Sequence, residues 1–192
     1  YRQQRILEVL NSKEVFTVED MKELQMDIKN LQADEFVPIF LEQLSKQSLS
    51  KQEQEAVSLL KEWNFEDDQA EAAPLLFQTI LLELSNVLFG EKISDEMMEL
   101  FEGKAQVIDE LIRRANEGNE GPWIKNNGGL SEVIYDALKQ TIETLSERYG
   151  NKMSEWKWGD ERQLQFSHPL SSVSPLQYIF NSKQAIPVSG SA

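Results

Sequence analysis

The chain has 192 residues and a formal net charge of −14, with 33 Asp and Glu against 19 Lys and Arg, no cysteine and one histidine. An acidic surface repels phosphate backbones and anionic headgroups, which argues against nucleic acid and a membrane surface as partners. The lack of cysteine excludes disulfides, thiolate nucleophiles and Cys-ligated zinc. A hydrophobic content of 40% over this length fits one domain with a real core.

The N-terminal third has the pattern of successive helices. Apolar residues at helical spacing predict a first helix over residues 2–10. Thr17 begins a sequence like a capping box and predicts a second helix. Its apolar stripe would consist of Met21, Leu24, Ile28 and Leu31. Pro38 lies within an apolar run and predicts either the start of a new helix or a kink, because proline lacks an N–H and clashes with the preceding turn.

A central helix is predicted further along the chain. Ser50 opens a cleaner capping box, which predicts a helix extending to about Trp63. Residues 70–89 form the most apolar segment, and a helix that is apolar nearly all round belongs in the core. Pro74 stands near its start, where proline is tolerated, and Gly90 is expected to close it with a positive φ.

Shorter elements follow. Helices are predicted over residues 95–102 and 105–115, and the glycine-rich segment 116–129 is predicted to be a loop. An amphipathic helix over residues 131–149 should end at Gly150. Its apolar face would contain Ile134, Leu138, Ile142 and Leu145.

The period changes near the C-terminus. Leu164 and Phe166 alternate with polar residues and predict a short strand, followed by a Ser/Pro-rich tail. The fold class is therefore mainly α, a multi-helix domain with a short C-terminal β region whose strands begin at about residue 162. We divide it into a helical lobe at 1–155 and a region of short strands and extended tail at 156–192.

A complete active site is hard to assemble from these residues. His168 is the only histidine, and its place before Pro169 favours a structural imidazole over a catalytic one. Neither a dinucleotide-binding GxGxxG motif, nor a phosphate-binding loop, nor a GxSxG nucleophile motif occurs in the sequence.

Two clusters invite a choice between binding and structure. Glu66, Asp67 and Asp68 offer oxygen ligands for calcium, but their spacing does not fit an EF-hand, which favours a solvated acidic turn. Four tryptophans can form either an aromatic ligand surface or packing anchors, and their places beside glycines and turns favour the anchors. They are Trp63, Trp123, Trp156 and Trp158.

An ordered set of motifs along nearly the whole chain resembles the penicillin acylase (penicillin amidase) family of N-terminal nucleophile hydrolases. The most specific are Trp156-Lys157-Trp158-Gly159-Asp160 and Phe166-Ser167-His168-Pro169-Leu170. The others are Arg2-Gln3-Gln4-Arg5-Ile6, Phe16-Thr17-Val18-Glu19-Asp20-Met21, Gln25-Met26-Asp27, Ala33, Trp63, Ala72-Ala73, Phe180-Asn181 and Pro187-Val188-Ser189-Gly190. Arg162 departs from the pattern, because many relatives carry a histidine there.

The resemblance implies a position inside a larger enzyme. The chain corresponds to an internal fragment of the family's β subunit and of its αββα fold. The chain begins with Tyr1 and not with an initiator methionine, and residues 186–192 end in the middle of a segment, which agrees with a fragment. The nucleophile, a serine at the start of the β subunit that uses its own α-amino group as the base, would lie upstream. So would the asparagine of the oxyanion hole.

One supporting residue is implied within the chain. The family has an arginine close behind the active site, and Arg2 is the position that we match to it, with Arg5 as the fallback. A cation near the terminal amine favours its neutral, basic form. The alternative for Arg2 is a role in capping the first helix or in pairing with an acid.

The expected function is that of one part of an amidohydrolase. It would cleave acylated amines through an acyl-enzyme, with penicillin, cephalosporin and acyl-homoserine-lactone side chains equally open. The implied partners are the remaining β-subunit segments, the α subunit and a small acyl amide. The fragment itself would be inactive and hold no cofactor. Calcium would be ligated elsewhere in the complete enzyme. The complete enzyme would be located outside the cytoplasm. The alternatives are a non-enzymatic acidic helical interaction module and an acidic metal- or carbohydrate-binding domain.

Overall fold

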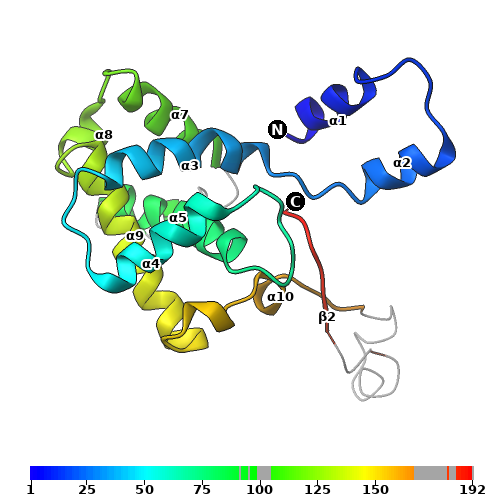
Figure 1. Ribbon diagram of the computed structural model, residues 1–192. Coiled ribbons are helices and arrows are strands. Elements are labelled where there is room, and N and C mark those ends of the chain that lie inside the picture. The colour runs from blue at the N-terminus through cyan, green and yellow to red at the C-terminus, as the bar shows by residue number, and fades with distance from the viewer. Residues whose placement is uncertain (91, 95, 99–104, 167–180, 182–184, 192) are drawn as a thin grey trace.

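The computed structural model describes residues 1–192 except 91, 95, 99–104, 167–180, 182–184 and 192, and shows a helical body with an N-terminal arm (Figure 1). The elements in chain order are α1 (Arg2–Leu10), α2 (Val18–Gln25), α3 (Leu31–Leu44), α4 (Lys51–Glu62), α5 (Ala73–Phe89), α7 (Ala105–Asn116), α8 (Pro122–Lys125), α9 (Leu130–Tyr149), a 3-10 turn (Met153–Glu155), α10 (Trp158–Glu161), β1 (Gln163–Leu164) and β2 (Ile186–Pro187). The fold is mainly α with a short β region, as the sequence predicts.

The core is built around α5. This helix packs along α9 and also contacts α4, α7, α8 and α10. Burial of its apolar side chains on several faces confirms the central place predicted from its composition. The predicted apolar face of α9 is likewise buried, and consists of Ile134, Leu138, Ile142 and Leu145.

Local signals place several helix ends correctly. The Thr17 Oγ1 atom accepts a hydrogen bond from the Asp20 N–H (3.2 Å), and the Asp20 carboxylate accepts one from the Thr17 N–H (2.7 Å). Ser50 and Glu53 form the same reciprocal pair at the start of α4. Gly150 ends α9 with φ of +85°. The Thr17–Asp20 and Ser50–Glu53 pairs satisfy amide groups that the first turn of a helix leaves without a partner.

The second predicted helix is shorter than its apolar stripe suggests. α2 ends at Gln25, so Ile28 and Leu31 do not lie on it. The Asp27 carboxylate accepts from the Lys29 N–H (3.1 Å), and the Asn30 side chain accepts from the Ala33 N–H (2.9 Å), which starts α3. These Asx contacts compete with the helical ladder and break the stripe.

Four other predictions need correction in whole or in part, or fall outside the described residues. Of the two outcomes predicted at Pro38, the start of a new helix is wrong, because α3 continues through this residue, and the kink stays a prediction. Gly90 follows α5 with φ of −52°, so a positive φ is not used there. The predicted loop at 116–129 contains the short helix α8, which begins with Pro122 at a position where proline is favoured. Most of the predicted helix at 95–102 lies outside the described residues.

The C-terminal region forms a two-stranded antiparallel sheet. β1 pairs with β2 through Gln163 with Pro187 and Leu164 with Ile186. The predicted strand stops before Phe166. Among the residues that the structure describes, no helix has the length and apolarity needed to cross a bilayer.

The N-terminal arm, which we define as residues 1–27, projects from the helical body (Figure 1). Neither α1 nor α2 contains a buried residue. The hydrophobic cluster instead runs from Ala33 to Trp158 along the chain.

Candidate functional site

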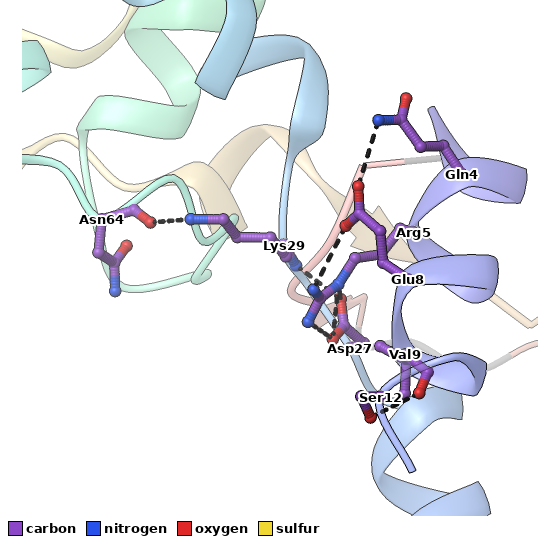
Figure 2. A network of polar contacts seen from close by, with 8 residues as sticks. All are labelled: Gln4, Arg5, Glu8, Val9, Ser12, Asp27, Lys29 and Asn64. Atoms are coloured by element: carbon purple, nitrogen blue, oxygen red, sulfur yellow. Dashed lines mark hydrogen bonds and ion pairs between the residues drawn. The ribbon is translucent and has the colours of Figure 1, made fainter. Parts of the chain in front are cut away.

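The two candidate arginines lie on α1 and have different surroundings. Arg2 is exposed in the first turn, and its side chain makes no hydrogen bond or ion pair with any described residue. Arg5, one turn further on, points toward Asp27 in the segment that leads into α3 (Figure 2). The structure therefore brings Arg5, and not Arg2, into a polar network within this chain.

Arg5 forms a forked contact with Asp27. Its Nη2 atom lies 2.6 Å from Asp27 Oδ2, and its Nε atom lies 3.1 Å from Oδ1 and 3.2 Å from Oδ2. Glu8 adds a weaker contact at 3.7 Å. Two donors on one carboxylate fix the orientation of both groups, as a single-point contact with lysine does not.

The ionisation of the pair follows from this geometry. The hydrogen bond with Asp27 raises the pKa of Arg5 above its ordinary value. The hydrogen bond with Arg5 holds the pKa of Asp27 below its ordinary value, with help from the Lys29 N–H. The pair is thus fully charged at neutral pH and holds α1 against the segment that leads into α3.

Lys29 extends this network into a second loop. Its Nζ atom donates to the Asn64 carbonyl oxygen (2.7 Å) and lies 5.1 Å from the centroid of the Phe65 ring. The backbones of Lys29 and Glu66 also form an isolated antiparallel β-bridge. The arm is therefore connected through Asp27 and Lys29 to the loop between α4 and α5 (Figure 2).

A second polar contact joins the start of the arm to α3 and α7. The Tyr1 hydroxyl donates to Glu35 Oε2 (2.7 Å), and Arg113 Nε donates to Glu35 Oε1 (2.8 Å). Partial burial works to raise the pKa of Glu35, but the hydrogen bonds from Arg113 and Tyr1 outweigh it and lower the pKa overall. Asp109 lies nearby, accepts from Gln32 and has its pKa raised by burial.

The acidic turn is not solvated throughout, contrary to the prediction. Asp67 is fully buried, and both of its carboxylate oxygens lie within 3.2 Å of Asn30 Nδ2. Ser191 also hydrogen-bonds to this carboxylate, but burial dominates and raises the pKa of Asp67. No group of three or more His, Asp or Glu among the described residues is arranged to hold a metal ion. Asp67 is therefore a structural acceptor that joins three distant segments.

The tryptophan and glycine motif has a packing role. The backbone N–H of Trp158 donates to the Glu71 carbonyl (2.9 Å), and that of Gly159 donates to the Gln69 carbonyl (2.8 Å). Trp158 Nε1 donates to the Gly190 carbonyl (3.1 Å). The motif thus fastens the C-terminal segment onto the loop before α5.

The prediction of packing anchors is confirmed for three of the four tryptophans, because Trp63, Trp156 and Trp158 are buried. It is wrong for Trp123, which is 38% exposed and contacts Phe89 edge to ring at 4.9 Å. Trp123 lies on the short helix α8, and it keeps this aromatic contact while part of its ring stays in solvent. His168 lies outside the described residues.

Sequence reasoning did not group the residues that hold these contacts together. Asn30, Asp67 and Ser191 are separated by up to 161 positions, and no local spacing marks them as a group. Glu35 and Arg113 are 78 positions apart and are ordinary charged residues on amphipathic helices. The side chains of these five residues donate and accept hydrogen bonds between segments that are distant in the chain, and so hold those segments together.

The fold and these contacts define a mainly helical lobe whose arm and tail are fixed by polar contacts. The chain belongs to the penicillin amidase family, because the family's sequence profile matches residues 1–192. Among solved structures, it is similar to a thermostable penicillin G acylase from Alcaligenes faecalis, with a TM-score of 0.61 and 18% sequence identity. The match covers 81% of this chain and 33% of that chain, so the chain spans about a third of that protein's length. At this identity the likeness concerns the fold. No curated protein sequence matches this chain.

Proposed function

We propose that this chain acts as the helical lobe of a penicillin-acylase-type amidohydrolase that cleaves the amide of an acylated amine. Support comes chiefly from the family match over all of residues 1–192. The acyl-enzyme would form on an N-terminal serine supplied by polypeptide outside this chain, so the chain alone would be inactive. The lobe's own contribution would be to position segments, in keeping with its polar contacts.

Within this proposal, Arg2 is the residue that would support the active site. Its side chain makes no hydrogen bond or ion pair with described residues, whereas the guanidinium of Arg5 is engaged by Asp27. A free guanidinium at the start of α1 is available to a neighbouring segment. Its charge would lower the pKa of a nearby terminal amine and so favour the basic form that the reaction needs.

The implied partners and conditions belong to the same proposal. The remaining β-subunit segments and an α subunit would complete the enzyme. Calcium would be ligated by parts of the complete enzyme outside this chain. The enzyme would work outside the cytoplasm, and the substrate would be a β-lactam side-chain amide or an acyl-homoserine lactone.

The test is hydrolysis of chromogenic phenylacetyl and aliphatic acyl anilides by this chain and by the complete polypeptide of its gene. We expect activity only in the complete polypeptide, and its loss when the β-chain serine is changed to alanine. Activity of the chain alone would contradict the assignment of the nucleophile. Inactivity of both over many acyl groups would favour a non-enzymatic interaction module.

Changing Arg2 in the complete enzyme tests its role. Arg2→Ala should lower kcat with little change in KM, and the acidic limb of the rate profile should move to higher pH. The limb moves because loss of a cation raises the pKa of the amine, which must be neutral to act. Arg114→Ala, which removes an exposed arginine from the body, is the control. An unchanged pH profile in Arg2→Ala would assign the residue no part in tuning the base.

A further inference from the structure

Exposed apolar side chains gather on the N-terminal arm. Of the 15 large hydrophobic residues that are exposed among the described residues, eight lie within residues 1–26. These eight are Tyr1, Ile6, Leu7, Leu10, Val15, Val18, Met21 and Met26. Scattered exposed apolar residues are normal in proteins, but a concentration in one segment indicates a contact surface.

The apolar residues of each arm helix share a face. Ile6, Leu7 and Leu10 are spaced three and four positions apart on α1, and Val18 and Met21 are three apart on α2. Helices of nine and eight residues are too short to be stable by themselves, and such helices gain their stability from packing an apolar face. Within the described structure these faces have no cover.

Polar contacts already fix the direction of the arm. The Tyr1–Glu35 hydrogen bond attaches the arm to the body, and the Arg5–Asp27 pair holds α1 against the end of the arm that leads into α3. Figure 2 shows Arg5 directed toward Asp27, with the Glu8 carboxylate between Arg5 and Gln4. The apolar faces are thus held in a set orientation without being buried against the body.

The charge of the chain limits what can cover the arm. Residues 1–27 contain four of the 19 basic residues and six of the 33 acidic ones, so the arm has the same mild excess of negative charge per residue as the rest of the chain. A basic partner would therefore find no stronger complement on the arm than elsewhere on the chain. A lipid surface and a second copy of this chain would both meet repulsion from the acidic body.

We propose that the apolar faces of α1 and α2 dock on an apolar surface of the same amidase polypeptide, formed by segments outside residues 1–192. The inference rests on the proposed function, in which this chain is one part of a longer enzyme. The length comparison supports it, because two thirds of the matched penicillin G acylase chain lies beyond the match. The polar contacts of Tyr1 and Arg5 then serve to aim the arm at that surface.

Cysteine labelling of the complete polypeptide tests the docking. Because residues 1–192 contain no cysteine, single Leu7→Cys and Met21→Cys variants each add one thiol, whose maleimide modification is followed by peptide mass spectrometry. Leu82→Cys, also an exposed apolar position on a helix, is the matched control. We expect the arm thiols to react at least about tenfold more slowly than the control, which corresponds to about 1.4 kcal/mol of opening free energy.

The outcomes separate docking from function. Equal labelling rates in a polypeptide that hydrolyses acyl anilides would overturn the docking and leave the proposed function standing. Slow labelling of the arm in an inactive polypeptide would support docking while the proposed function fails. Protection that appears only at high protein concentration, or only with phosphatidylcholine vesicles, would overturn the proposal in favour of a second copy or a lipid surface.

Discussion

At the scale of single residues, the contact at Asp67 joins three parts of the chain. Its carboxylate accepts from the Asn30 side chain, whose oxygen starts α3, and from Ser191 near the C-terminus. A buried carboxylate costs free energy unless its oxygens are hydrogen-bonded, and these donors supply that compensation. The residue therefore stabilises the fold only as long as its partners remain in place.

Removing this carboxylate should destabilise the chain. Asp67→Ala leaves the buried Asn30 amide with only a 3.5 Å contact to Ser191 Oγ, and we expect a loss of about 1–3 kcal/mol in the free energy of unfolding. Urea unfolding followed by tryptophan fluorescence measures it. Glu62→Ala, which removes an exposed acid five residues earlier in the chain, is the control for net charge. Equal unfolding midpoints for the two variants would contradict the role of Asp67.

The Arg5–Asp27 pair should show a pH-dependent coupling. A double-mutant cycle with Arg5→Gln and Asp27→Asn, read from amide exchange in α1, should give about 0.5–1 kcal/mol at neutral pH. The pKa of Asp27 is lowered in the folded state, so its contribution is present above the unfolded pKa of about 3.9 and is lost as pH falls through the folded value. A coupling that persists at strongly acidic pH would show that charge is not its source.

At the scale of elements, α10 depends on a close approach between backbones. A Cβ atom on Gly159 would lie 2.9 Å from Pro187 Cβ and 3.0 Å from the Gln69 carbonyl oxygen. Neither neighbour is the end of a flexible side chain. The glycine thus allows α10, β2 and the loop before α5 to meet, which gives the tryptophan motif its physical meaning.

Gly159→Ala should therefore separate these elements. We expect a loss of about 1–3 kcal/mol, because backbone and Pro187 must shift to admit one methyl group. The control is Gly121→Ala, where a Cβ meets nothing within 4 Å and φ is −72°. Thermal unfolding followed by circular dichroism compares the two variants. Equal Tm values for Gly159→Ala and Gly121→Ala would mean that the backbone and Pro187 shift to admit the methyl group at little cost in free energy.

At the scale of the whole molecule, excess negative charge opposes compaction. The net charge is −14, and the ion pairs of the described residues are largely on the surface, where each contributes little. Added salt shortens the Debye length from about 10 Å at 0.1 M to about 3 Å at 1 M, which weakens the repulsion between distant charges.

Sodium chloride should therefore stabilise this chain. If screening removes about 1 kcal/mol of repulsion, Tm should rise by about 2–4 °C, as calorimetry would measure. Sucrose at equal osmolality is the control for general solvent effects. A fall in Tm with salt would show that the surface ion pairs together outweigh the general repulsion.

Helix positions could be read from the sequence wherever the signal was local. Thr17 and Ser50 specify helix starts through side chains three residues from their partners, and Gly150 specifies an end through its own backbone conformation. Nearly continuous apolar composition located α5, and apolar periodicity located α9, because both helices are buried in one core. The prediction from apolar periodicity failed at Ile28, because side-chain contacts of Asp27 and Asn30 with nearby backbone N–H groups end the helix that the periodicity would have continued.

By itself, the sequence determined the mainly helical class, the central helix, the places of the capped helices and the family resemblance, because these depend on residues close together in the chain. Only the tertiary structure decided that Arg5 engages Asp27, that Asp67 is buried between Asn30 and Ser191, and that the arm leaves its apolar faces uncovered. Those contacts join segments up to 161 positions apart, and no local spacing encodes them. They form only when packing of the core brings the loops and the tail together.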